Sequence, residues 1–513
     1  MVYNTATAKN KFTVVEGNFM NLKNIIKNLK FTKSEGTLDI EVVDITYDSR
    51  KVKKGYAFVC LVGHNSDGHD YIQDAIDSGA SVIISQIEIA VPSVTVIQVE
   101  NTRTFLAGMC VNFFEHPAKK LVTIGITGTK GKTTTSFMIK SILESQGKKV
   151  GLIGTIGAVY SDKVVKLNNT TPESYELQKN LKQMYDEGYT HCVIEASSIG
   201  LKDHRLDGIT FNFGIFTNFS HDHIGKDEHK DINEYLECKS MLFKKCEVGF
   251  VNIDDERYTQ IIKNHTCKIK TYGLKHKPDY KAENIKLLHD GSNIGVKFDF
   301  VSKDVSGILC FAIPGRFNVY NALAAASVCL YMGIKYENVK VGLMKSRVKG
   351  RVEALNISDK YSLFIDYAHN ALSMENILMT FKEYEPKRLI TLFGAGGNRP
   401  KIRRYEMGEI SGKYSDLSVI TSDNPRFENP LDIIEDIKVG INKSHGKYVV
   451  IPDRKEAIRY CIENARSGDI IILAGKGHED YQEINGKKYP MDERNIVKDV
   501  CAELNTNNKQ DIV

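Results

Sequence analysis

A lysine and two threonines follow closely spaced glycines near residue 130, a combination that can bind the phosphates of a nucleotide. The stretch consists of Gly128, Thr129, Lys130, Gly131, Lys132, Thr133 and Thr134. Backbone N–H groups and a helix N-terminus can surround an anion, Lys132 can meet the β- and γ-phosphates, and a threonine hydroxyl can reach Mg²⁺. The standard pattern has a glycine five residues before Gly131, where this chain has Ile126. We therefore predict a variant nucleotide-binding loop rather than an ordinary turn.

Further candidates for metal or phosphate binding lie downstream. Residues 191–195 form an apolar run that ends in Glu195. A carboxylate at the C-terminal end of a strand beside a phosphate loop is a typical Mg²⁺ ligand, although it could also be a solvated strand-end glutamate. Two histidines, one of them His223, flank an aspartate at 221–223. They suggest a metal or phosphate site, but each could equally be a surface turn residue.

Lys239 falls on the apolar stripe of a predicted helix. The stripe is marked by Ile232, Leu236, Leu242 and Phe243. A lysine in this position usually packs its stem and keeps its ammonium in water. The alternative is a desolvated lysine that can act in its neutral form. Periodicity alone favours the first interpretation.

Two asparagines open a predicted alanine-rich helix. Asn318 and Asn321 are three residues apart, which places them on one face of its first turn. Helix capping is one role for Asn318, and recognition of a nucleotide base is the other.

These residues need a sheet to position them. The run Leu121–Ile126 predicts a buried strand before the loop, and apolar residues at helical spacing predict a helix after it, up to Gly147. The chain continues to about residue 345 with strands alternating with helices. This pattern predicts an α/β fold with a mostly parallel sheet covered on both faces.

The first third shows a similar alternation from Ile40 onward. Polar clusters at 47–52 and 67–70 separate its short apolar runs. Such clusters are solvated loops by default, but their hydroxyl, arginine and Gly-His residues could hold a polar ligand. We place a boundary near Pro117.

The last third begins near Gly350 and contains four apolar runs that each lead into a polar loop. In an open parallel sheet these strand ends line one crevice. The charged residues of these loops are Arg399, Arg426, Lys476, His478 and Glu479. We expect them to converge on a pocket that suits an amino acid with an extra ionic group.

The composition limits the class of protein. A chain of 513 residues is long enough for about three domains. The net charge of +5 is mild and gives no argument for nucleic acid. Ten scattered cysteines indicate reduced thiols, and no run is long enough to span a membrane. We expect a cytoplasmic protein.

Together these motifs resemble those of the Mur ligases, the ATP-dependent amide-forming enzymes of peptidoglycan precursor synthesis. The segments that point to the member adding the third residue are Asp-Ser-Arg at 48–50, Asn-Thr-Thr-Pro at 169–172, Asp-Asn-Pro-Arg at 423–426 and Gly-Lys-Gly-His-Glu at 475–479. The resemblance implies a UDP-sugar-binding domain at 1–117, an ATP-binding domain with a mononucleotide-binding sheet at 118–349, and an amino-acid-binding domain with a Rossmann-like sheet at 350–513.

The resemblance also implies roles for individual residues. ATP would be bound by residues 128–134 with Asn318, Asn321, Arg351 and Asp366. Mg²⁺ would be held by Thr133, Glu195, His223 and a carbamate on Lys239. The UDP-N-acetylmuramoyl-L-alanyl-D-glutamate substrate would contact Ser49, Thr170, Thr171, Ser197 and Arg205. Lys132, Lys239, Arg351 and His369 would be catalytic. The carbamate role replaces the solvated-ammonium interpretation of Lys239, because CO₂ addition requires a neutral amine.

The incoming amino acid would be meso-diaminopimelate, held by Arg399, Asp423, Asn424, Pro425, Arg426, Gly475 and Glu479. L-lysine lacks the second carboxylate and would leave Arg426 unpaired, which discriminates strongly. Four residues depart from the family pattern: Ile199, Asp203, Lys349 and Asn398.

The implied reaction phosphorylates the D-glutamyl carboxylate and then replaces the phosphate by an amine. The alternatives are the same reaction with L-lysine, a folate-polyglutamating ligase, and a regulatory or transport NTPase that uses the nucleotide as a switch. We expect a monomer.

Overall fold

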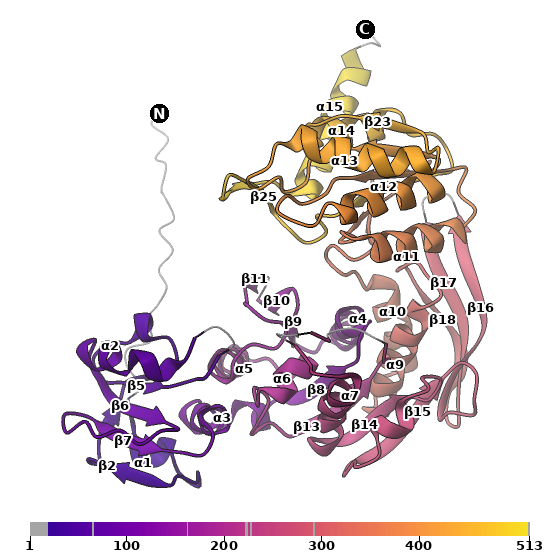
Figure 1. The fold of residues 1–513 in the computed structure, drawn as a ribbon. Helices are drawn as coiled ribbons and strands as arrows, with labels where there is room; N and C mark the ends of the chain where they lie inside the picture. Colours follow the sequence, from indigo (N-terminus) through magenta and orange to yellow (C-terminus); the bar gives the residue numbers. More distant parts are fainter. Residues whose placement is uncertain are drawn as a thin grey trace, which may run out of the picture.

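The computed structural model describes residues 19–63, 66–161, 163–220, 224–225, 228–290 and 293–510. Three α/β units follow one another along a curved molecule, the first in indigo, the second in magenta and the third in orange and yellow (Figure 1). The predicted α/β class with a mostly parallel central sheet is confirmed. The boundaries at residues 117 and 349 stay predictions. Among the described residues, no helix combines the length and apolar character that a membrane span requires.

The N-terminal unit is built on a sheet with the strand order β2-β7-β6-β5-β4. Its strands are β2 Lys33–Glu35, β4 Asp44–Thr46, β5 Tyr56–Val59, β6 Ala80–Ser85 and β7 Thr95–Gln98. Around it lie the pair β1 Met20–Asn21 and β3 Glu41–Val42, the 3-10 turns Ser49–Lys51 and Gly68–Tyr71, and the helices α1 Leu22–Ile25, α2 Ile72–Asp77 and α3 Thr102–Phe113. Asn101 starts α3 because its side chain accepts from the backbone N–H groups of Arg103 and Thr104.

The central sheet has eleven strands among the described residues, in the order β11-β10-β9-β12-β8-β13-β14-β15-β16-β17-β18. The strands are β8 Val122–Thr127, β9 Val150–Gly154, β10 Gly157–Tyr160, β11 Lys163–Val165, β12 His191–Glu195, β13 Phe211–Phe216, β14 Cys246–Asn252, β15 Lys268–Gly273, β16 Tyr280–Asp290, β17 Asn293–Ser302 and β18 Ser306–Phe311. The seven neighbouring strands β9-β12-β8-β13-β14-β15-β16 pair in parallel, whereas β10 and β11 at one end of the sheet and β17 and β18 at the other pair antiparallel.

Helices cover both faces of this sheet. They are α4 Lys132–Ser145, α5 Ser174–Asp186, α6 Ser198–Lys202, α7 Ile232–Ser240, α8 Tyr258–Ile261, α9 Asn318–Tyr331 and α10 Tyr336–Lys345. Val193 of β12 packs in the same core as α4 and α9, whereas its neighbours Cys192 and Ile194 pack with α5. Because successive side chains of a strand point to opposite faces, a sheet covered on both faces needs apolar residues at nearly every position. This accounts for the continuous apolar runs in the sequence.

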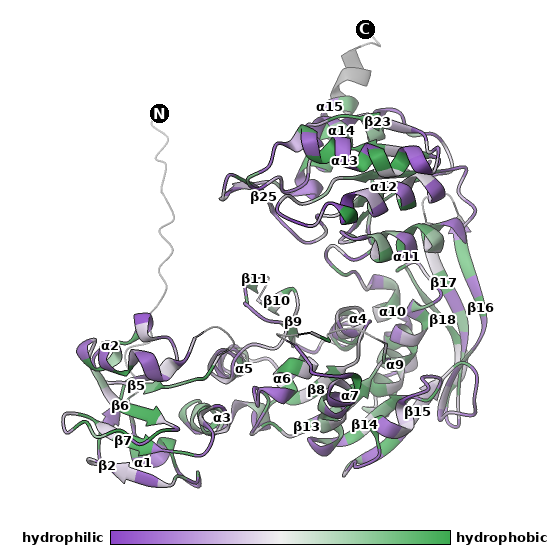
Figure 2. Ribbon diagram, viewed as in Figure 1, coloured by the Kyte–Doolittle hydropathy of each residue, from purple (hydrophilic) through white to green (hydrophobic). Residues whose placement is uncertain are grey.

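The C-terminal sheet has the order β19-β20-β24-β21-β22-β23. Its strands are β19 Glu353–Leu355, β20 Ser362–Asp366, β21 Arg388–Phe393, β22 Leu417–Ile420, β23 Tyr448–Val450 and β24 Asp469–Ala474, and the hairpin β25 Tyr481–Ile484 and β26 Lys487–Pro490 follows. Its helices are α11 Ala371–Lys382, α12 Ile402–Tyr414, α13 Pro430–Lys443, α14 Arg454–Glu463 and α15 Glu493–Gln510. Figure 2 shows hydrophobic and hydrophilic residues along the same ribbon of α12 and α13, as expected of helices with one face on a sheet. The four predicted strands are confirmed as β20, β21, β22 and β24.

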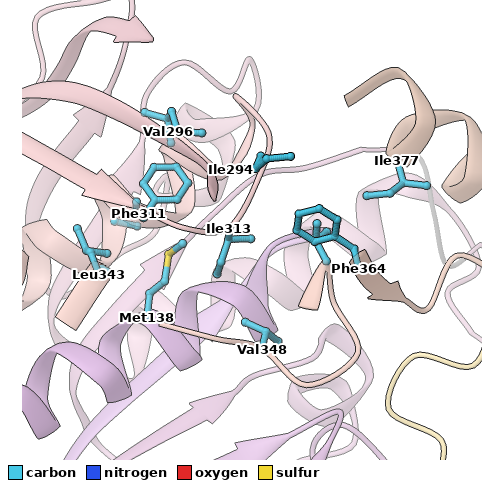
Figure 3. Packing of buried hydrophobic residues seen from close by; sticks show 14 of the residues in the cluster. Met138, Ile294, Val296, Phe311, Ile313, Leu343, Val348, Phe364 and Ile377 are labelled. Atoms are coloured by element: carbon cyan, nitrogen blue, oxygen red, sulfur yellow. The ribbon is translucent and has the colours of Figure 1, made fainter. Parts of the chain in front are cut away.

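The central and C-terminal units share one continuous apolar core. Figure 3 shows Ile313 and Val348 between Met138 of α4 and Phe364 of β20. Tyr384, which follows α11, adds polar links: its hydroxyl donates to the Gly295 carbonyl at 3.0 Å and accepts from the Gly315 N–H at 3.0 Å. The C-terminal sheet is therefore attached to the far edge of the central sheet as well as to the connecting segment at residue 350.

Candidate active site

The predicted phosphate loop lies between β8 and α4, as the sequence indicates. Gly128 and Gly131 have φ angles of 146° and 84°, a region that L-residues with a side chain rarely adopt. A Cβ atom at Gly131 would also come within 2.3 Å of Asn321 Oδ1. Ile126 is fully buried and β8 continues to Thr127, so position 126 is part of the strand. The loop therefore needs no glycine there.

Lys132 is the first residue of α4 and folds back over the loop. Its ammonium donates to the carbonyls of Gly128 at 2.8 Å and Thr129 at 3.1 Å. The Lys130 N–H donates to Asn218 Oδ1 at 2.9 Å, and the buried Thr129 hydroxyl lies 3.0 Å from the Tyr235 hydroxyl. The loop is thereby fixed to two neighbouring elements, and Tyr235 links it to α7.

Glu195 ends β12 next to the loop and is 2% exposed. Its Oε2 accepts hydrogen bonds from the Thr133 hydroxyl at 3.1 Å and from the Thr155 hydroxyl at 3.0 Å. A Cβ atom at Gly154 would come within 2.2 Å of Glu195 Oε1, so the neighbouring strand leaves room for the carboxylate. The strand-end carboxylate therefore lies beside a phosphate-loop threonine, as predicted. His223, the third predicted metal ligand, lies outside the described residues.

Lys239 is 1% exposed, so the solvated-ammonium interpretation is wrong. The buried residues of α7 are Tyr235, Cys238 and Lys239. Of the predicted apolar stripe, Leu242 and Phe243 are buried just after this helix, whereas Ile232 and Leu236 are half-buried. The Lys239 ammonium lies 4.3 Å from the centroid of the Tyr235 ring. Lys239 is therefore linked to the phosphate loop through Tyr235, which contacts Thr129 of that loop.

Asn318 and Asn321 lie at the start of α9, next to the phosphate loop. Asn318 is not the N-cap, because that position is Phe317, so the capping interpretation is wrong. Its amide donates to the Pro314 carbonyl at 2.6 Å, and Asn321 donates to Asn318 Oδ1 at 2.8 Å. Asn321 Oδ1 in turn accepts from the Thr135 hydroxyl of α4 at 3.2 Å. Both asparagines are thus held by hydrogen bonds next to the phosphate loop.

The residues matched to the muramoyl-peptide substrate gather on the other side of Glu195. The Thr171 hydroxyl donates to the Glu195 carbonyl at 2.7 Å and lies 2.9 Å from the Ser197 hydroxyl. Arg205 donates to the Thr171 carbonyl at 3.0 Å, and the Thr170 hydroxyl lies 3.1 Å from that of Thr155. These four residues form one cluster with the end of β12.

Ser49 belongs to the N-terminal unit and is separate from this cluster. It opens the 3-10 turn Ser49–Lys51, which Asp48 caps. The neighbouring residues Asp48 and Arg50 line a cavity of about 500 Å³ whose other wall is formed by Tyr175 and Glu176 of α5. The junction of the N-terminal and central units is therefore hollow, and charged side chains are among those that line it.

The polar turn at 67–70 has a structural role, and its histidine is not free to bind a ligand. His69 Nδ1 lies 2.6 Å from Asp67 Oδ1, and its Nε2 accepts from the Gln86 N–H at 3.0 Å. Both ring nitrogens are thus bonded within the N-terminal unit.

In the C-terminal unit, two of the predicted loops are bonded to each other. Lys476 is fully buried, and its ammonium donates to Asn424 Oδ1 at 2.8 Å and to Glu479 Oε2 at 2.9 Å. A Cβ atom at Gly475 would come within 2.7 Å of Asp423 Oδ2. The predicted convergence is therefore confirmed for Lys476 and Glu479, which both contact Asn424 of the neighbouring loop.

Arg426 is held by its neighbours in an uncommon conformation. Its φ angle is 53°, and its N–H donates to the Glu483 carbonyl at 3.0 Å. The guanidinium donates to the Gly397 carbonyl at 2.7 Å. Arg399 is exposed and lies, like Arg426, within about 4 Å of a Cβ built on Gly396. Both predicted arginines thus flank one glycine turn. Pro425 approaches the same turn so closely that a Cβ at Gly397 would lie 1.9 Å from its carbonyl oxygen.

Three further candidates lie at the end of β20 and in the connecting segment, two of them on the ring of Tyr367. The Arg351 guanidinium lies 5.2 Å from the centroid of this ring, and the His369 ring lies 4.6 Å from it. Burial raises the pKa of the Asp366 carboxyl, against the backbone N–H groups of Val352 and Ala368 that donate to it at 2.8 Å.

His478 contacts the same Tyr367 ring, and no contact of this histidine with Arg399 or Arg426 is found among the described residues. Its ring is 4.8 Å from Tyr367, and burial and Arg351 lower its pKa. Gly350 packs directly on the same backbone, because a Cβ there would lie 2.1 Å from the His478 nitrogen. The connecting segment and the Gly475–Glu479 loop are therefore in contact.

Several contacts of the site were missed from the sequence. Tyr235 and Thr155 bond to the phosphate loop and to Glu195, and Glu173 pairs with Arg205 at 2.9 Å and with Arg103 at 3.3 Å. Glu173 directly follows the Asn-Thr-Thr-Pro segment, which is the signal that could have revealed it. Tyr235 and Thr155 carry no such signal.

Three family models match successive parts of the chain. The model of the Mur ligase family catalytic domain matches residues 41–114, that of the Mur ligase middle domain matches 126–329, and that of the Mur ligase glutamate ligase domain matches 350–477. Together they cover well over half of the sequence. The chain belongs to the Mur ligase family.

Individual Mur ligases are similar along nearly the whole chain. A relative from Caldanaerobacter subterraneus subsp. tengcongensis, named UDP-N-acetylmuramoyl-L-alanyl-D-glutamate--2,6-diaminopimelate ligase, is 44% identical over 94% of this chain and 99% of its own. A Clostridium acetobutylicum protein of the same name, numbered 1, is also 44% identical over 94% of this chain. A solved structure of a ligase with that name has a TM-score of 0.71 at 29% identity and covers 95% of this chain and 99% of its own.

The four departures from the Mur ligase pattern have contacts of different kinds. Asp203 accepts from Arg205 at 2.8 Å, so this carboxylate partly neutralises a matched substrate contact. Lys349 lies 3.9 Å from Asp492. Asn398 accepts from the Phe427 N–H at 3.2 Å and so braces the Arg426 loop. For Ile199 nothing in the structure explains the exchange.

Proposed function

We propose that this chain is an ATP-dependent ligase that joins meso-2,6-diaminopimelate to UDP-N-acetylmuramoyl-L-alanyl-D-glutamate, with release of ADP and phosphate. The names of the relatives that match 94% of the chain support this reaction.

One hydrogen-bonded connection carries the proposal. Glu195 accepts from Thr133 of the phosphate loop through its side chain at 3.1 Å, and from Thr171 through its backbone carbonyl at 2.7 Å. Residues for ATP and residues for the muramoyl-peptide therefore meet at the two ends of a single residue. This spacing suits a reaction in which a substrate carboxylate takes a phosphoryl group directly from ATP, because such transfer depends mainly on positioning.

The first step forms an acyl phosphate. A D-glutamyl carboxylate oxygen attacks the γ-phosphorus, and the bond to the β–γ bridging oxygen breaks to release ADP. We assign nucleotide binding to residues 128–134 with Asn318, Asn321 and Asp366. Lys132 and Arg351 offset the charge that builds up on the phosphates, and His369 contacts the same Tyr367 ring as Arg351.

The second step forms the amide. The uncharged amine of the amino acid attacks the acyl carbon, phosphate leaves with the oxygen that it received, and the nitrogen loses a proton. Domain closure would exclude the water that otherwise hydrolyses the acyl phosphate.

The residues beside the phosphate loop fit Mg²⁺. Thr133 and Glu195 offer the hydroxyl and carboxylate oxygens that this ion prefers, with substrate phosphates completing its shell. Among the described residues no group of three or more histidine, cysteine, aspartate or glutamate side chains could hold a metal alone. We assign Thr133, Glu195, His223 and a carbamate on Lys239 to Mg²⁺, which when bound would neutralise phosphate charge. Addition of CO₂ to the neutral Lys239 amine forms the N–C bond and releases a proton, and the burial of this lysine keeps the carbamate out of bulk water.

The C-terminal loops would hold the amino acid. Arg426 and Arg399 can pair with its carboxylates. Gly475 and Glu479, with Asp423, Asn424 and Pro425, would receive the distal ammonium and carboxylate. L-lysine lacks one of these carboxylates, so its binding would leave one of the two arginines without a substrate partner.

ATP-dependent phosphate release tests the proposal. The reaction contains the UDP-muramoyl-dipeptide and either meso-diaminopimelate, L-lysine or no amino acid. We expect release to require the dipeptide and meso-diaminopimelate. Equal or faster turnover with L-lysine would overturn the amino-acid assignment, and release without any amino acid would favour a nucleotide switch instead.

A further inference from the structure

A buried arginine touches the ends of two strands in the C-terminal sheet. Arg454 is the first residue of α14 and is 2% exposed. Its Nη2 donates to the Ala474 carbonyl at 2.8 Å, and its Nη1 donates to the Ser422 carbonyl at 3.2 Å. Ala474 ends β24, and Ser422 lies just after β22.

Each of these carbonyls lies directly before a loop of the candidate amino-acid pocket. Ser422 precedes the Asp-Asn-Pro-Arg segment at 423–426, and Ala474 precedes the Gly-Lys-Gly-His-Glu segment at 475–479. Strands β22 and β24 do not pair with each other, because β21 lies between them. One planar guanidinium therefore bridges an entire strand, and its rigid fork fixes the separation of the two loops.

The arginine is itself anchored by a buried acid. Glu493, the first residue of α15, is 1% exposed, and its Oε1 accepts from Arg454 Nε at 2.9 Å. Burial raises the pKa of the Glu493 carboxyl, whereas Arg454 opposes that shift. A buried ion pair is a weak source of stability, since well-packed apolar residues often stabilise as much. Its presence here is better explained by the geometry that it imposes.

The two loops depend on that geometry for their own contacts. Lys476 donates to Asn424 of the other loop at 2.8 Å, and to Glu479 of its own loop at 2.9 Å. A change in the loop separation would therefore reach the groups that we assign to the amino acid.

We propose that Arg454, anchored by Glu493, is a positioning residue that sets the spacing of the amino-acid pocket. This proposal rests on the assignment of residues 423–426 and 475–479 to that pocket. The proposal predicts a change in KM for the amino acid but not for ATP or the UDP-muramoyl-dipeptide. The reason is that the phosphate loop and the muramoyl-peptide cluster belong to the central unit.

The chain offers a comparison pair at the opposite end of the same sheet. Arg388 starts β21 and pairs with Asp469, which starts β24 and is 1% exposed. The Arg388 Nε donates to Asp469 Oδ1 at 3.1 Å. This pair links strand starts, where no loop of the pocket lies, and its loss should affect stability alone.

The experiment compares R454K, E493Q and R388K with the unchanged enzyme. KM is measured for meso-diaminopimelate, ATP and the UDP-muramoyl-dipeptide in turn, together with kcat and Tm. R454K keeps the charge but loses the fork, so we expect KM for meso-diaminopimelate to rise roughly tenfold to a hundredfold, as a misplacement of about 1 Å can cause. The other two KM values should stay within about twofold, and E493Q should shift KM in the same direction by less. R388K should lower Tm and change no KM.

The proposal is overturned if R454K and E493Q lower Tm without changing KM for the amino acid, or if all three KM values rise together. E493Q, which keeps a hydrogen-bond acceptor, decides the matter if R454K does not fold. Failure of the proposed function itself gives a different result, because the unchanged enzyme would then show no turnover that depends on meso-diaminopimelate.

Discussion

The tight contact at Gly350 gives a prediction whose size follows from the structure. In G350A the new Cβ would lie 2.1 Å from the His478 nitrogen and 2.3 Å from the Gly477 carbonyl carbon, both of them backbone atoms. A separation of 3.0 Å, the closest approach that real Cβ atoms make, requires a shift of about 0.9 Å. A further cost of about 1 kcal/mol arises because Gly350 has a φ of 69°. A displacement near 1 Å can cost on the order of 10²-fold in rate, so kcat/KM for meso-diaminopimelate should fall by about that factor.

The matched control is G333A. Gly333 has a φ of 83°, but a Cβ there would have nothing within 4 Å. Both variants should lose a similar free energy of unfolding to backbone strain, measured by denaturant titration, and only G350A should lose activity in the phosphate-release assay. A G350A enzyme within threefold of G333A in kcat/KM would show that the segment and the loop do not need this contact.

Three further variants test single residues. K239A should abolish ligation, with partial recovery on addition of short carboxylic acids that replace the carbamate; undiminished turnover would contradict this role. E195Q should keep its Tm, because the amide oxygen can still accept from the Thr155 N–H, while losing ligation at least about a hundredfold. Burial lowers the pKa of His191 to about 4, and the unfolded chain takes up this proton near pH 6.5. The free energy of unfolding should therefore fall as the pH drops from 6.5 to 4, and H191Q should flatten this slope in unfolding titrations; an unchanged slope would argue against a buried neutral imidazole.

The parts of the fold that depend on local pattern could be predicted from the sequence. The loop between β8 and α4 and the four strands of the C-terminal sheet have strong periodicity and clear turn residues. Strand order could not be read in this way, because it depends on which distant segments pair. The sequence does not indicate that β24 lies between β20 and β21.

The candidate site was predictable to the extent that its residues lie in short motifs. Glu195 and Asn321 follow directly from such motifs. Lys239 was placed correctly on a buried stripe, but its ammonium was expected in water, because periodicity does not indicate that Tyr235, bonded to Thr129, lies over the lysine. Arg454 and Glu493 are 39 residues apart, and helical periodicity gives no information about a pair at that distance.

The double attachment of Tyr384 bears on whether the C-terminal sheet can be regarded as a separable module. Its hydroxyl bonds to Gly295 and Gly315, which belong to the central unit in sequence, and Ile313 packs in the core that the two units share. A chain cut at residue 349 would therefore expose apolar side chains that no polar surface replaces. The central unit on its own should be prone to association, and a transplanted C-terminal unit would need the β16–β18 edge of the central sheet to accompany it.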